Sequence, residues 1–223
     1  TRTRALGAIP LKSTPASSLS EDEAVALVAE HLAARGLGDL GWGKEASSLR
    51  ERMRVLHEVL GDPWPDVSDE ALAGNAHEWL LPWAKRLARG GSLSNVSMLD
   101  ALRSMLPWPD AARLDELAPE KMPIPAGGTR PIDWSGAHPV LTLRVQQAFG
   151  WTDTPRLVDG RVPLVLHLTD PAGRPAAVTS DLTSFWAGPY QDVRAQLRGR
   201  YPKHPWPEDP LHAEPTNRAK RRG

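Results

Sequence analysis

The sequence has no cysteine and no apolar run that approaches the ~18 residues of a membrane-spanning helix. The first absence excludes disulfides and thiolate chemistry and fits a reducing compartment, so we expect a cytoplasmic protein. The second predicts that the chain has no membrane partner. The N-terminal residues also lack the charged and then apolar segments of a secretory signal.

Intact nucleotide-binding and metal-binding motifs are missing as well. The stretch Gly38–Lys44 fits G-x-x-x-x-G-K, but Glu45 stands where a phosphate loop needs Ser or Thr to hold Mg²⁺. The stretch also follows a helix stop at Gly36 instead of a buried strand. His57 and His77 are each followed by Glu, yet neither has a second His four positions later. We therefore expect no catalytic residue, no metal site and no cofactor in this chain.

Tyrosine and phenylalanine are scarce, with two of each, whereas there are nine tryptophans. Four of the tryptophans adjoin prolines: Trp64, Trp83, Trp108 and Trp206. A tryptophan can stack on a nucleic-acid base, but beside a proline it more often fills the space between helices, with its indole N–H bonded to a carbonyl. We therefore predict that most of the tryptophans lie in the core.

Charge is balanced overall, with 27 basic and 27 acidic side chains, but it is unevenly distributed. Residues 198–223 hold seven cations against three carboxylates, which leaves the rest of the chain slightly acidic. The candidates for contacts with nucleic-acid phosphates are Arg198, Arg200, Lys203, Arg218, Lys220, Arg221 and Arg222. The alternative is a solvated terminus that only aids solubility.

Helix signals dominate the first half of the chain. Ser20 and Glu23 fit a capping box and Gly36 fits a stop signal, so a helix is predicted between them. Apolar residues at helical spacing predict a second helix over residues 44–60. Ser68 is expected to cap a third.

The second half of the chain changes to the period of two that is typical of strands. Segments on either side of Gly127–Gly128 predict a hairpin. Residues 162–168 alternate along a strand in which we expect His167 to be a hydrogen-bonded core histidine. Residues 139–150 fit either a strand or a short helix, and a helix is predicted over residues 179–185.

These patterns predict an α+β protein, in which an N-terminal helical segment precedes a small, mainly antiparallel sheet flanked by helices. We expect three parts: the tail of an upstream domain at residues 1–12, a helical segment at 13–96, and an α+β domain at 97–223. The last part carries a proline-rich arm and a basic tail. Because the chain begins at Thr1 and not at Met, we expect it to be a fragment of a longer polypeptide.

The proline-rich arm is the most distinctive stretch. Residues 198–210 read RGRYPKHPWPEDP, and four prolines within nine residues exclude a helix interior or a central strand. Prolines fix φ, so the stretch is predicted to hold Tyr201, His204 and Trp206 at set spacings along an extended path. We expect these three side chains to dock on another surface, preferably within the same chain.

The arm also belongs to a wider resemblance. Together with RVPLVLHL at 161–168, PAGRP at 171–175 and DLTSFW at 181–186, it resembles the C-terminal region of HrpB-type ATP-dependent helicases of the DEAH/RHA group. The resemblance is specific from about Ser97 to Pro210 and looser before that.

The resemblance implies an accessory region of an RNA helicase whose motor lies outside this chain. It implies an OB-fold upstream, and ATP and Mg²⁺ bound only in the absent RecA-like domains. The chain itself has no Asp-Glu-x-His motif, since Asp69-Glu70 is followed by Ala71-Leu72. The expected partners are the parent's own helicase domains and RNA. The alternative is a protein-interaction module that docks a protein partner through the arm from Tyr201 to Pro210.

Overall fold

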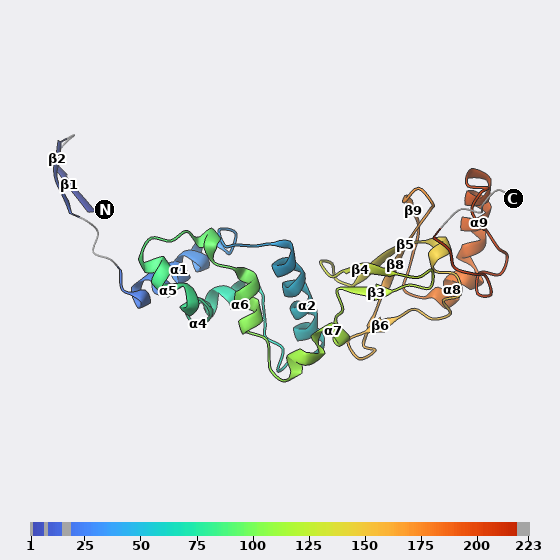
Figure 1. The fold of residues 1–223 in the computed structure, drawn as a ribbon, viewed down its shortest axis with the longest axis horizontal. Coiled ribbons are helices and arrows are strands. Elements are labelled where there is room, and N and C mark those ends of the chain that lie inside the picture. Colours follow the sequence, from blue (N-terminus) through green and yellow to red (C-terminus); the bar gives the residue numbers. More distant parts are fainter. Residues whose placement is uncertain (1, 7–8, 15–18, 218–223) are drawn as a thin grey trace. The chain divides into compact units, whose positions relative to one another are not determined.

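The computed structural model describes residues 2–6, 9–14 and 19–217 (Figure 1). The chain divides into two compact units. The first comprises Thr1–Arg50 and Pro65–Leu106, and the second comprises Glu51–Trp64 and Pro107–Gly223. Helix α2, Lys44–Leu60, therefore contributes its first residues to one unit and its last residues to the other.

Two paired strands lie in the segment that the sequence analysis assigned to the tail of an upstream domain. Strands β1, Arg2–Leu6, and β2, Ile9–Thr14, pair antiparallel with a register shift between Arg4 and Ala5. Strand β2 thus extends beyond residue 12, where the upstream segment was expected to end.

The rest of the first unit is helical. Its elements are α1, Glu21–Arg35; α3, Asp69–Gly74; α4, Ala76–Trp79; η1, Leu81–Trp83; α5, Ala84–Ala88; η2, Leu93–Asn95; and α6, Met98–Ser104. The Ser20 hydroxyl accepts a hydrogen bond from the Glu23 backbone at 3.2 Å, and the Glu23 carboxylate accepts one from the Ser20 backbone at 2.8 Å. This capping box fixes the start of α1, which packs against α3, α4 and α5.

The third predicted helix is divided in two. Asn75, with φ −99° and ψ 15°, ends α3 and precedes α4. The Trp79 indole N–H donates to the Leu72 carbonyl at 2.8 Å, which ties the two short helices together across this break.

Helix α6 belongs to the first unit, although the sequence suggested a boundary between residues 96 and 97. Gly41 pairs with Ser97 in a parallel bridge, and the Gly41 N–H donates to the Val96 carbonyl at 3.0 Å. A Cβ at Gly41 would lie 2.7 Å from the Ser94 and Val96 carbonyl oxygens, so this close approach requires glycine. The division between the units falls after Leu106.

The second unit is built on a five-stranded sheet. Its strands are β3, Lys121–Pro123; β4, Thr129–Asp133; β5, Val140–Arg144; β8, Val165–Thr169; and β9, Pro175–Thr179. They lie in the order β3-β4-β5-β8-β9, and β5 and β8 are parallel while the other neighbours are antiparallel. The predicted α+β class with a mainly antiparallel sheet is therefore confirmed.

Short elements complete this unit. They are η3, Asp110–Arg113; α7, Leu114–Leu117; η4, Val145–Gln147; the hairpin of β6, Arg156–Leu157, and β7, Val162–Pro163; α8, Leu182–Ala187; and α9, Pro189–Arg200. The ambiguous stretch at 139–150 contains both a strand, β5, and a short helix, η4. Thr179, expected to begin a helix, instead ends β9, and α8 starts after its cap at Asp181.

The register of the sheet corrects the interpretation of His167. Thr142, His167 and Val178 are paired across β5, β8 and β9, and all three are exposed. On β5 and β8 the alternate residues, Leu141 and Leu166 among them, are buried. His167 thus lies on the exposed face of the sheet, because its burial is decided by the neighbouring strands and not by the apolar residues beside it in sequence.

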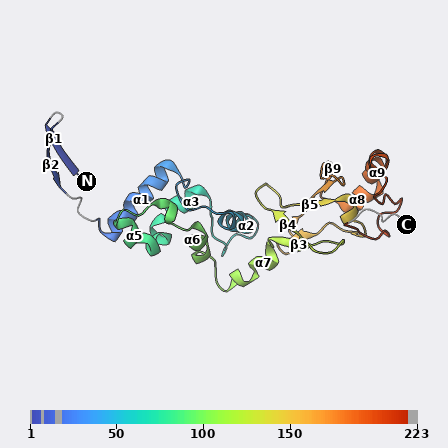
Figure 2. The same ribbon diagram turned by 45° about the horizontal axis from the view of Figure 1, so that its top comes forward.

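Aromatic side chains form the centre of the second unit. Phe149, Phe185, Trp186 and Tyr190 lie with ring centroids 4.9 to 6.3 Å apart, in tilted or edge-to-face pairs. Helices α8 and α9, which carry three of them, pack side by side (Figures 1 and 2). Among the described residues, no helix is both long enough and apolar enough to cross a membrane.

Candidate functional site

The arm, Tyr201–Pro210, leaves the end of α9 and folds back against it. The Tyr190 hydroxyl donates to the Pro207 carbonyl at 2.8 Å, and the Arg194 guanidinium donates to the Trp206 carbonyl at 2.9 Å. Beyond these contacts, the Gly150 N–H donates to the Pro210 carbonyl at 3.0 Å. The arm carbonyls thus accept hydrogen bonds from side chains and backbone of their own unit.

The three candidate docking residues lie at the base of the arm. The Trp206 indole N–H donates to the Tyr201 carbonyl at 3.0 Å, and the half-buried His204 ring meets the Tyr201 ring edge-on at 6.2 Å. Burial lowers the pKa of His204, and the positive charge of Arg144 lowers it further. Neutral imidazole is therefore favoured at this position.

Tyr201 is held by a buried carboxylate. Its hydroxyl donates to Asp170 Oδ2 at 2.8 Å, while Asp170 Oδ1 accepts the backbone N–H groups of Ala172 and Arg174. Burial opposes ionisation of Asp170, but these three hydrogen bonds outweigh it and lower the pKa of that carboxyl. The hydrogen bond to Asp170 in turn raises the pKa of Tyr201.

Replacing Tyr201 with Phe is expected to destabilise the unit in a pH-dependent way. The hydroxyl favours ionised Asp170, so its contribution is present above the unfolded carboxyl pKa of about 3.9 and is lost as the pH falls through the lower folded value. Urea denaturation of both proteins at neutral pH and at acid pH measures this difference. If the difference in the free energy of unfolding between the two proteins stays constant down to acid pH, the Tyr201 hydroxyl does not act through the ionised Asp170.

The predicted phosphate contacts are only partly described. Arg198 and Arg200 lie in the last turn of α9 and Lys203 follows in the arm, and all three are exposed. None of them has a carboxylate within 4 Å among residues 19–217. The other four predicted contacts, Arg218, Lys220, Arg221 and Arg222, lie outside the described residues.

A groove between β4 and β5, which we name the β4–β5 groove, was not predicted from the sequence. It has a volume of about 610 Å³, and its lining includes Arg130, Thr142, Arg144, Gln147, Thr169 and Asn217. Arg130 and Arg144 are fourteen positions apart, so no local motif joins them. The only signal in the sequence was the alternation along residues 140–144, which separates Thr142 and Arg144 from the buried Leu141 and Leu143.

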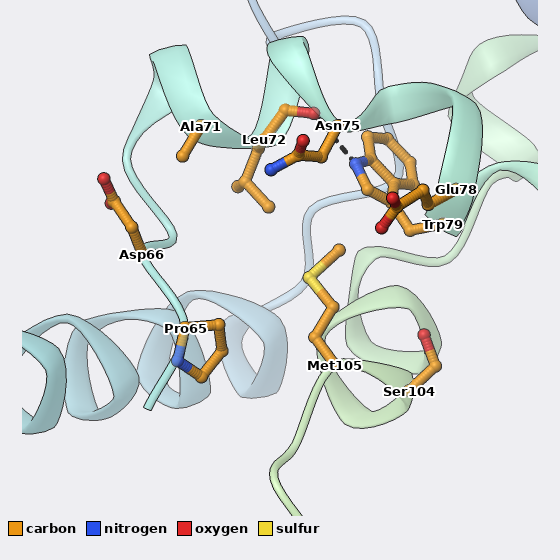
Figure 3. Close-up of a pocket in the computed structure, with 9 residues that line it drawn as sticks. All are labelled: Pro65, Asp66, Ala71, Leu72, Asn75, Glu78, Trp79, Ser104 and Met105. Carbon is orange, nitrogen blue, oxygen red and sulfur yellow. Dashed lines mark hydrogen bonds between the residues drawn. The ribbon is translucent and has the colours of Figure 1, made fainter. Parts of the chain in front are cut away.

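The first unit has a hollow of a different character, with a volume of about 350 Å³ (Figure 3). Its lining mixes apolar side chains, Leu72, Trp79 and Met105 among them, with polar ones, and Figure 3 shows the Met105 side chain reaching toward Trp79. Two carboxylates, Asp66 and Glu78, lie on its lining, which includes no cation among the residues that the structure describes. Because like charges repel, this lining disfavours an anionic ligand such as a phosphate.

Four of the nine tryptophans are buried in the core, which is fewer than the sequence predicted. Trp64, Trp79, Trp134 and Trp186 are at most 5% exposed, whereas Trp108 is 71% exposed. The near-match to a phosphate loop, Gly38–Lys44, follows helix α1, and its Gly41 is occupied by the bridge to Ser97. Within the described part of the chain, no group of three or more His, Cys, Asp or Glu side chains is placed to hold a metal ion.

Comparison with known proteins identifies the chain's relatives. The family model "ATP-dependent helicase C-terminal" (HrpB_C) matches residues 79–210. The protein named ATP-dependent RNA helicase HrpB from Escherichia coli K12 is 37% identical over 218 residues, which are 97% of this chain and 27% of the relative.

Solved structures agree with the sequence comparison. A crystal structure of the E. coli DExH-box NTPase HrpB is 38% identical with a TM-score of 0.79 and covers 96% of this chain and 27% of its own. A crystal structure of the E. coli DEAH/RHA helicase HrpB is 36% identical with a TM-score of 0.67 and covers 92% of this chain and 26% of its own. The chain spans about a quarter of the length of these relatives. It belongs to the family of HrpB-type helicase C-terminal regions.

Proposed function

We propose that this chain is an accessory region of an ATP-dependent RNA helicase, in which it positions nucleic acid beside the motor domains or braces them. The observation that carries the proposal is the exposed cluster of Arg198, Arg200 and Lys203, which has no carboxylate partner among the described residues. Such cations attract phosphates independently of sequence. A cytoplasmic location is part of the proposal, since a chain without cysteine fits a reducing compartment.

RNA binding by the chain is expected to be micromolar or weaker at physiological salt, because the rest of the chain is slightly acidic. Each phosphate contact contributes about 0.7 to the slope of log affinity against log salt, so replacing Arg198, Arg200 and Lys203 with Ala should flatten that slope by up to about 2. Fluorescence anisotropy with a labelled single-stranded RNA measures the slope. The matched control replaces the exposed cations Arg35, Lys85 and Arg89 with Ala, and equal effects of the two variants would contradict the proposal.

ATP hydrolysis is assigned to domains outside this chain. An ATPase assay of the 223-residue chain, with and without RNA, should therefore give background rates. Turnover that disappeared in Lys44→Ala would show that the stretch Gly38–Lys44 binds phosphate after all.

The second candidate function is docking of a protein partner through the arm. It is favoured by the apolar side chains of the arm that stay partly exposed, Pro205, Trp206 and Pro207. Salt separates the two functions, because phosphate contacts weaken steeply as salt rises whereas an apolar docking surface does not.

A further inference from the structure

We propose that the β4–β5 groove binds the phosphate backbone of single-stranded nucleic acid, with Arg130 and Arg144 as its cationic contacts. This inference rests on the proposed function, since it names a site for the nucleic acid. The groove volume of about 610 Å³ lies within the ~300–1,000 Å³ range of ligand clefts. All its lining residues belong to the second unit.

The groove exists because two neighbouring strands diverge. Strand β4 pairs with β5 only through Ile132 and Asp133, whereas residues 129–131 pair with β3 on the other side. The last residues of β5, Thr142 to Arg144, remain paired with β8. The turn at Gly127–Gly128, where both glycines have positive φ, completes one wall of the opening.

The charge of the groove is unbalanced. Arg130 and Arg144 are both half-buried, and neither has a carboxylate within 4 Å among the described residues. By contrast, Arg52, Arg113 and Arg194 each form an ion pair. A half-buried guanidinium that lacks a carboxylate gains most from an anion, and its planar donors match phosphate oxygens.

The remaining lining, as far as the structure describes it, supplies neutral hydrogen-bonding groups and no acid. Asn217 forms part of the rim: its amide donates to the Ala126 carbonyl and its oxygen accepts from the Gln147 amide, both at 2.6 Å. The carboxylate next to the lining residue Thr169 is Asp170, which is already bonded to Tyr201. From the rim residue Asn217 the sequence continues directly into Arg218, the first cation of the basic tail.

The lining contains no aromatic side chain among the described residues. Base stacking therefore cannot contribute inside the groove, and the available groups are those that bind phosphate and sugar oxygens. Recognition of the backbone without sequence preference is the chemistry that this set of residues supports.

The test measures binding of a labelled single-stranded RNA of mixed sequence to the 223-residue chain by anisotropy, between ~50 and ~200 mM salt. The double variant R130Q/R144Q should bind at least about tenfold more weakly at low salt and flatten the salt slope by about 1.4, at about 0.7 for each arginine. The control R35Q/R89Q removes the same charge from exposed positions of the first unit and should change affinity less than about twofold. Thr142→Glu, which places a carboxylate in the groove and leaves both arginines in place, should weaken binding as well.

Thermal melts establish that the variants are folded. Equal RNA affinities of R130Q/R144Q and R35Q/R89Q would overturn the proposal that the groove binds nucleic acid. In that case the proposed function would still stand if the variant of Arg198, Arg200 and Lys203 bound RNA more weakly than the wild type. No binding by the wild-type chain at low salt would overturn both. Inorganic phosphate is the second probe: free phosphate that binds the wild-type chain more tightly than the RNA does, and that R130Q/R144Q no longer binds, would assign the groove to a free anion and overturn the backbone assignment.

Discussion

Tyr190→Ala should lower the free energy of unfolding by about 3–5 kcal/mol, the range for deleting a buried aromatic side chain. Tyr190 is fully buried, and its ring meets those of Phe149, Phe185 and Trp186. Truncation removes these ring pairs, and it also removes the hydroxyl that holds the arm at Pro207. Urea denaturation followed by circular dichroism measures the decrease.

The matched control is Tyr190→Phe, which keeps the ring and removes only the hydrogen bond to Pro207. Its cost should be about 0.5–1.5 kcal/mol. It should also loosen the arm, so trypsin should cleave after Arg200 or Lys203 faster than in the wild type. A Tyr190→Ala variant as stable as Tyr190→Phe would show that the aromatic cluster does not organise this unit.

Arg52→Met should cost about 1–3 kcal/mol, because it leaves a buried carbonyl without its donor. The Arg52 side chain is 3% exposed and lies on the part of α2 that belongs to the second unit. Its guanidinium donates to the Ala118 carbonyl and forms ion pairs with Asp115 and Glu120. Methionine fills much of the same volume, so the decrease in stability reports the polar interactions and not a cavity.

The control for Arg52 is Asp115→Asn. The Asp115 side chain is 88% exposed, and removing its charge should cost less than about 1 kcal/mol. Equal effects of the two substitutions in urea denaturation would mean that the ion pair, and not the hydrogen bond to the buried carbonyl, stabilises this part of the unit.

The sequence predicted the elements whose signals are local. The bounds of α2 were predicted as residues 44–60. The two signals, the helical spacing of its apolar residues and the glycine directly after it, both lie within the segment itself. The capping box of α1 is confirmed for the same reason. The division of the third helix at Asn75 was missed, and the hydrogen bond that spans it, from the Trp79 indole to the Leu72 carbonyl, joins residues seven positions apart.

Non-local pairing explains what the sequence did not predict. The exposure of His167 depends on the parallel register between β5 and β8, whose paired residues are 25 positions apart. The groove depends on where β4 leaves β5, which the composition of neither strand reveals. The prolines predicted that the arm follows a fixed path. They did not identify Tyr190 and Arg194 of α9 as the residues that bind it, because the apolar spacing of that helix does not mark hydrogen-bond donors to another segment.

The sharing of α2 between the two units has a consequence for synthesis of the chain. Residues 51–64 leave the ribosome before the rest of the second unit, which begins at Pro107. The segment Pro65–Leu106, which belongs to the first unit, is synthesised between these two parts. The first unit can therefore complete its packing before Ala118, whose carbonyl accepts the hydrogen bond from Arg52, has been synthesised. We expect the second unit to be the later one to fold during translation, and a fragment that starts at Pro107 to lack a segment its core requires.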